Sequence, residues 1–150
     1  MLSVPTAIDQ AAPVLAHHEI DIDAPVDVVW NLHSDVNGWT AWNTDITSAH
    51  LDGDFGVGNS FDWSSYGFPV TSTIYDVADR ARVLWGGSSS GITGVHEWLF
   101  SAMPSGTHVV TNESFAGDPV EADRAGMQKL LDASLVAWLD HLKTAAESRR

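Results

Sequence analysis

The sequence contains no cysteine in its 150 residues. This absence excludes disulfide bonds, thiolate metal ligands and a cysteine nucleophile. Cationic residues are also scarce: 7 Lys and Arg stand against 20 Asp and Glu, for a formal net charge of -13 at pH 7. A surface that acidic repels phosphate groups, so we expect neither nucleic acid nor a membrane surface as a partner.

Long apolar runs are missing as well. No stretch approaches the roughly 20 apolar residues that a membrane-spanning helix requires. The first residues lack a basic segment and are interrupted by Pro5, Asp9 and Pro13, so we expect no signal peptide and a cytoplasmic protein. Residues 1–16 are expected to form a flexible arm and residues 17–147 a single domain, since no long linker divides them.

The motifs of common metal and cofactor sites are absent too. His17 and His18 are adjacent on a predicted strand, so they face opposite sides and do not chelate one ion together. Residues 52–54 (DGD) begin like a calcium loop, but the later ligands are missing. The glycines within residues 53–58 lack the strand-to-helix context of a dinucleotide site. We therefore expect no metal and no cofactor.

Tryptophan, by contrast, is abundant. Such side chains bring a large apolar area and one N–H donor, so they suit protein cores and ligand pockets equally well. Seven are present, at positions 30, 39, 42, 63, 85, 98 and 138.

The pattern of polar and apolar residues predicts an α+β domain. A strand over residues 18–22 precedes two short helices, the first of which is opened by Pro25. Alternation then predicts strands at residues 45–51, 59–66, 70–77, 81–85, 92–100 and 107–115. Residues 86–91 consist only of Gly and Ser and are expected to form a flexible loop. A long helix follows, with Asp118 as its N-cap and an apolar face from Met127 to Leu142.

The segment HHEIDIDAPVDVVWNLHSDVNGWTAWNTDI, residues 17–46, resembles the polyketide cyclase/dehydrase-like branch of the START/birch-pollen-allergen (SRPBCC) superfamily. Members of that branch have an apolar strand, an Ala-Pro helix start and a helix of D-x-x-x-W-x-x-W type. Asp35, Trp39 and Trp42 match the last of these patterns. The later segments GNSFDW, HEWLF and WLDHLK also agree, so the resemblance covers about residues 17–147.

The resemblance implies a helix-grip fold, in which a curved antiparallel β-sheet is wrapped around a long C-terminal helix and two short helices follow the first strand. It also implies a hydrophobic cavity between sheet and helix. A small hydrophobic molecule is then the expected partner, with aromatic and polyketide-like compounds among the candidates. Activities in the family include aromatic polyketide cyclisation, lipid or hormone binding, and regulation, and fold alone does not choose among them.

Nine residues are predicted to bind the ligand, because strand alternation and the helix stripe direct them toward this cavity or, for Trp42, because its short helix is of the kind that borders the pocket mouth. They are Trp42, Phe61, Trp63, Trp85, His96, Trp98, Asn112, Met127 and Leu131. Core packing is the alternative role for the aromatic residues. His96 is the candidate acid/base, since the unperturbed pKa of histidine lies near neutrality. Its alternative role is that of a hydrogen-bonded core histidine.

Asn112 and Glu113 are neighbours on the last strand and must point to opposite faces. We expect Asn112 to face the cavity and Glu113 to face outward, because an unpaired buried carboxylate costs several kcal/mol or becomes neutral. Three functions are compatible with such a cavity. The first is binding of a hydrophobic ligand, the second is a cyclase/aromatase-type enzyme in which His96 moves protons, and the third is a regulatory domain whose pocket is vestigial.

Overall fold

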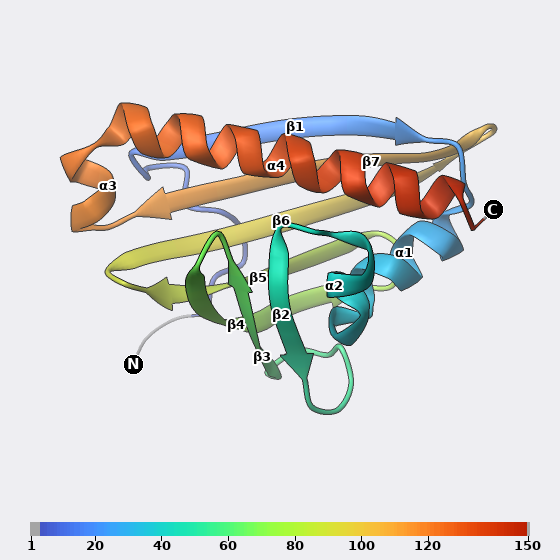
Figure 1. The fold of residues 1–150 in the computed structure, drawn as a ribbon, viewed down its shortest axis with the longest axis horizontal. Coiled ribbons are helices and arrows are strands. Elements are labelled where there is room, and N and C mark those ends of the chain that lie inside the picture. Colours follow the sequence, from blue (N-terminus) through green and yellow to red (C-terminus); the bar gives the residue numbers. More distant parts are fainter. Residues whose placement is uncertain (1–3, 150) are drawn as a thin grey trace.

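A seven-stranded antiparallel sheet curves around one long helix in the computed structural model, which describes residues 4–149 (Figure 1). The strand order is β1-β7-β6-β5-β4-β3-β2. The strands are β1 (Val14–Ile22), β2 (Ile46–Leu51), β3 (Ser60–Ser65), β4 (Phe68–Ala78), β5 (Arg82–Ser89), β6 (Ile92–Met103) and β7 (Gly106–Ala116). The helices are α1 (Val26–Ser34), the 3-10 turn η1 (Val36–Gly38), α2 (Trp39–Trp42), α3 (Asp118–Ala122) and α4 (Arg124–Glu147). The predicted helix-grip fold is confirmed.

The first strand starts four residues earlier than its alternation predicted. Val14 and Ala16 are buried and extend the inward-facing side of β1 toward the N-terminus. Residues 1–3 of the expected N-terminal arm lie outside the described residues. Farther along the arm, the backbone N–H of Asp9 donates to the Ser114 hydroxyl oxygen at 3.0 Å, so this part of the arm is bonded to β7.

Residues 86–91 do not form the loop that their composition predicted. β5 continues to Ser89, and only the next two residues turn, with positive φ angles. A Cβ atom at Gly86 would lie 2.2 Å from the carbonyl oxygen of Gly94 on β6. At Gly87 it would lie 2.4 Å from a carbonyl oxygen of β4. Gly86 and Gly87 therefore permit close contact between strands. The loop was predicted because glycine-rich segments are more often flexible.

The predicted C-terminal helix is divided in two, and the predicted cap at Asp118 is wrong. No side chain caps α3, and the chain leaves the helical conformation again at Asp123. The Asp123 side chain accepts a hydrogen bond from the backbone N–H of Gly126 at 3.0 Å and so caps α4. α4 then runs for 24 residues alongside β1 (Figure 1). Between residues 4 and 149, no helix is long and apolar enough to cross a membrane.

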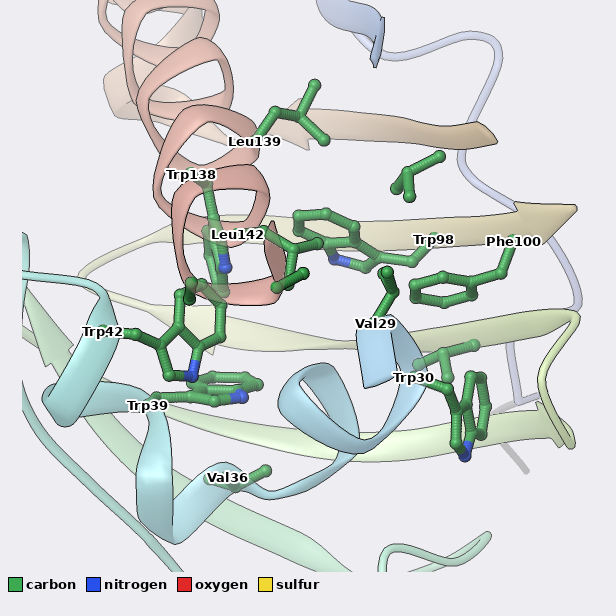
Figure 2. Packing of buried hydrophobic residues seen from close by; sticks show 14 of the residues in the cluster. Val29, Trp30, Val36, Trp39, Trp42, Trp98, Phe100, Trp138, Leu139 and Leu142 are labelled. Carbon is green, nitrogen blue, oxygen red and sulfur yellow. The ribbon is translucent and has the colours of Figure 1, made fainter. Parts of the chain in front are cut away.

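The space between sheet and α4 holds two buried clusters. The larger one lies where α1 and α2 cover the sheet (Figure 2). It is called the aromatic cluster here, because its buried members include Trp30, Trp39, Trp42, Phe61, Trp85, Trp98, Phe100 and Trp138. Trp39 is fully buried in it, with its ring centroid 5.3 Å from that of Trp138 and 5.4 Å from that of Phe61. The smaller cluster joins β1, α3 and α4 through Val14, Ala16, Val120, Leu131 and Leu135.

His33 is a polar member of the aromatic cluster. Its side chain has no exposed surface, and neither ring nitrogen has a hydrogen-bond partner among residues 4–149. Its ring centroid lies 4.6 Å from that of Trp98. Burial lowers the pKa of His33 to about 3, so the imidazole stays neutral at physiological pH.

Replacing His33 with leucine should stabilise the protein. The substitution His33→Leu removes two unpartnered polar atoms at similar volume, so the free energy of unfolding at pH 7 should rise by about 1–2 kcal/mol. Because the unfolded chain protonates first, the native protein should also lose stability as pH falls from 6.5 toward 3, and the variant should lose less. Urea denaturation at pH 7 and about pH 4.5 measures both effects. His50→Leu, at an exposed position, is the control, and a less stable His33→Leu protein would contradict the argument.

Candidate ligand-binding site

A cavity of about 320 Å³ lies between the inner face of the sheet and α4. It separates the two buried clusters, because Trp63, Trp85 and Trp138 border it on one side and Leu131 and Leu135 on the other. Strands β3 to β7 form one wall, and α3 and α4 form the opposite wall. The volume is within the range of small-molecule sites, roughly 300–1,000 Å³.

Aromatic and aliphatic side chains border the mouth of the cavity, together with one carboxylate. Tyr66, Phe68 and Leu130 line the cavity and are still between 46% and 57% exposed, so they mark where it meets the surface. The Tyr66 hydroxyl is hydrogen-bonded to Asp45, and burial together with this carboxylate raises the pKa of Tyr66. His141 Nε2 on α4 lies 3.3 Å from Asp45 Oδ2. Asp45 therefore links the β3–β4 hairpin to α4 beside the opening.

Glu113 lies on the cavity wall, and the prediction that Asn112 faces inward is wrong. Asn112 is on the outer face of β7, where its Nδ2 donates to Glu97 Oε1 at 2.9 Å and its Oδ1 lies 2.6 Å from His17 Nδ1. These polar partners hold the amide outside. The Glu113 side chain is only 13% exposed, and burial raises its pKa to about 8. The carboxyl is thus tolerated inside because it is neutral at pH 7.

His96 lies directly across from Glu113 in the pairing of β6 with β7, and its Nδ1 is 3.3 Å from Glu113 Oε1. On its other side, Nε2 is 2.6 Å from the Thr111 hydroxyl oxygen. That hydroxyl donates its own proton to the Glu97 carbonyl oxygen at 3.3 Å, so it accepts from His96 Nε2–H. Nδ1 is then the unprotonated nitrogen, and it faces Glu113.

The imidazole of His96 is neutral for the same reason as the carboxyl beside it. Burial, with a smaller contribution from His33, holds the pKa of His96 well below its ordinary value. A neutral imidazole and a protonated carboxyl at this distance are neighbours without being an ion pair. From His96 through Thr111 to the Glu97 carbonyl, each donor therefore points away from the cavity.

Four of the nine predicted binding residues lie on the cavity wall: Trp63, Trp85, Met127 and Leu131. Their contact with a ligand stays a prediction. Trp42, Phe61 and Trp98 do not line the cavity but lie inside the aromatic cluster, where Phe61 and Trp98 contact other rings. His96 is 1% exposed and stands one layer behind the wall, in contact with Glu113.

Sequence reasoning missed Glu113 and the mouth residues Tyr66 and Phe68. The signal for Glu113 was present, since it has the same strand parity as the apolar residues Val109 and Phe115. The cost of burying a charge outweighed that signal in the prediction. Tyr66 and Phe68 surround the turn of a hairpin, where sequence alternation carries no information about facing.

Glu113 should make the free energy of unfolding depend on pH between about 4.5 and about 8. The folded protein holds the Glu113 proton to about pH 8, whereas the unfolded carboxyl ionises near 4.5, so folding binds protons between these values. The free energy of unfolding should therefore fall, by roughly 3–5 kcal/mol, as pH rises through this window. Glu113→Gln, which is neutral at every pH, should flatten the slope in denaturation experiments from pH 5 to 8.5. Glu121→Gln is the exposed control, and an unchanged slope in Glu113→Gln would refute the assignment.

The family model for polyketide cyclase/dehydrase and lipid transport proteins matches residues 13–147. A search of curated proteins found no match. Among solved structures, the chain is similar to hypothetical protein jhp0584 from Helicobacter pylori, with 18% identity, a TM-score of 0.79, and coverage of 97% of this chain and 99% of that one. It is also similar to a START superfamily protein from Mycobacterium smegmatis, with 11% identity, a TM-score of 0.75, and coverage of 91% and 99%.

A third similar structure is StfQ, a di-domain ARO/CYC protein from the steffimycin biosynthetic pathway. It is 15% identical with a TM-score of 0.73, and the match covers 91% of this chain and 51% of StfQ. At these identities the solved structures establish the fold, whereas the family model spans nearly the whole sequence. The chain belongs to the polyketide cyclase/dehydrase and lipid transport family.

Proposed function

We propose that the protein binds a small hydrophobic molecule in the cavity between the sheet and α4. The observation that carries this proposal is the cavity itself, about 320 Å³ of space with aromatic and aliphatic walls and exposed apolar side chains at its mouth. Apolar ligand surface buried there contributes about 25 cal/mol per Å² before the cost of ordering the ligand. Polyketide-like and lipid-like compounds are the candidate ligands, and the family description supports both classes.

The uneven filling of the interior favours binding over a domain with a vestigial pocket. A vestigial pocket would be filled by large side chains along its whole length. Here the aromatic cluster fills one end, and the other end keeps its volume beside small wall residues such as Gly94 and Ser134. We infer that Trp63, Trp85 and Met127 contact the ligand from the two walls.

Filling the cavity from α4 should weaken binding. The substitution Ser134→Phe places a ring in the cavity, so we expect at least a tenfold loss of affinity for the neutral fluorescent probe N-phenyl-1-naphthylamine. Quenching of the tryptophans on the wall measures the dissociation constant. The control is Ala133→Phe, at an exposed position on the same helix. Equal affinity in the two variants would place the probe outside the cavity and remove the support for the proposal.

A proton-transferring enzyme is the second candidate function, and the contact between Glu113 and His96 favours it. A carboxyl on an apolar wall, with the unprotonated nitrogen of a histidine behind it, is suited to move protons to and from a substrate. Because His96 does not reach the wall, it would act through Glu113 as a positioning residue. The sequence prediction that assigned proton transfer to His96 is therefore replaced by one in which Glu113 touches the substrate.

Glu113→Gln separates the two candidate functions. Glutamine keeps the shape and hydrogen bonding of a protonated carboxyl but transfers no proton, so ligand binding should survive. If the protein is an enzyme, turnover of a linear polyketide mimic should fall by at least about 100-fold. His96→Gln should then shift the pH profile of the reaction while leaving affinity unchanged. Absence of turnover by the native protein, together with intact binding, would leave ligand binding as the function.

A further inference from the structure

The cavity wall carries acidic groups and no cationic ones. Within the described part of the chain, the ionisable residues that line it are Asp45, Tyr66 and Glu113, and none is Lys, Arg or His. Asp45 and Tyr66 are bonded to each other at the mouth, so Glu113 is the ionisable group of the interior. A carboxylate or phosphate ligand would meet no opposite charge there, within a protein whose net charge is -13.

One oxygen of Glu113 is available to a ligand. Oε1 is the oxygen that faces His96. Oε2 borders a space that exists because residue 94 is glycine: a Cβ atom there would lie 3.5 Å from Oε2 and 3.3 Å from the Phe115 ring. Gly94 and Phe115 both line the cavity. This notch next to Oε2 therefore has a polar side and an aromatic side.

The direction of the hydrogen bonds behind Glu113 decides what that oxygen can do. Thr111 uses its proton on the Glu97 carbonyl, so His96 Nε2–H points to Thr111 and the lone pair of Nδ1 points to Glu113. The carboxyl proton is best placed on Oε1, where it can be donated to Nδ1. Oε2 is then a carbonyl oxygen, which accepts a hydrogen bond and donates none.

We propose that Glu113 Oε2 is the polar subsite of the cavity and that it selects uncharged hydrophobic ligands carrying a hydroxyl group, which donates to it, over carboxylate analogues. This inference rests on the proposed binding function and specifies its ligand class. The hydroxyl lies in the notch left by Gly94, and the apolar body of the ligand lies toward Trp85 and α4. Ligands with an acceptor alone, such as ketones, face the lone pairs of Oε2 and gain nothing from the subsite.

The test uses naphthalene probes of nearly equal size: 2-naphthalenemethanol, its methyl isostere 2-ethylnaphthalene, 2-acetylnaphthalene and 2-naphthoate. Dissociation constants are measured at pH 7 by tryptophan quenching. In the native protein 2-naphthoate should bind at least tenfold more weakly than the alcohol. The affinity ratio of alcohol to ethyl compound should fall at least fivefold in Glu113→Leu and stay within twofold of native in Glu113→Gln. Comparing ratios cancels the different hydration of the two probes.

A second variant keeps the proposal testable if Glu113→Leu does not fold. Gly94→Ala places a methyl group in the notch while Glu113 remains, so it should weaken alcohol binding more than ethyl binding. An unchanged ratio in the variants, or a preference for the ketone, would overturn the inference while 2-ethylnaphthalene still binds. If 2-ethylnaphthalene itself does not bind, the proposed function fails as well. The two failures are therefore distinguishable.

Discussion

The packing of α4 against the curved sheet is the constraint on which the other features depend. One helix of 24 residues faces the inner surface of a seven-stranded sheet, which is wider than a single helix. At one end α1 and α2 supply extra rings, and Trp39 joins the sheet to Trp138 of the helix. At the other end α4 presents smaller side chains such as Leu131 and Ser134, so the hollow persists. The cavity is thus the unfilled remainder of the core, bordered by the aromatic cluster.

A second consequence of this arrangement is electrostatic. An ionised carboxylate in the hollow would have no cation beside it and little water around it. Glu113 is accommodated because it keeps its proton and faces a histidine that is neutral. The pair carries no net charge, which lets an apolar interior contain two polar groups. A proton on an apolar wall is a feature shared by binding sites and by sites of acid catalysis.

The sequence was sufficient for the order of the elements, because alternation and the helix stripe at Met127 to Leu142 report facing directly. The sequence was insufficient to predict which part of the interior is filled and which is hollow. Trp98 and Trp85 lie on neighbouring strands and are both buried, but of the two only Trp85 borders the cavity. The sequence also misjudged residues 86–91, whose glycines serve strand contact. The assignment of Asn112 and Glu113 failed because the effect of burial on the pKa of a carboxyl depends on how other elements pack around it.

The close approach of β5 to its neighbours restricts how such a pocket can diversify. At positions 86 and 87 any side chain would collide with main-chain atoms, which cannot move without breaking the sheet. The floor of the hollow is consequently fixed in shape. Variation in volume and ligand preference among related sequences then has to come from the opposing surface, where Ser134, Leu130 and Met127 can be exchanged one at a time. A single helix face would thereby carry the adaptive changes, while the β-scaffold stays constant.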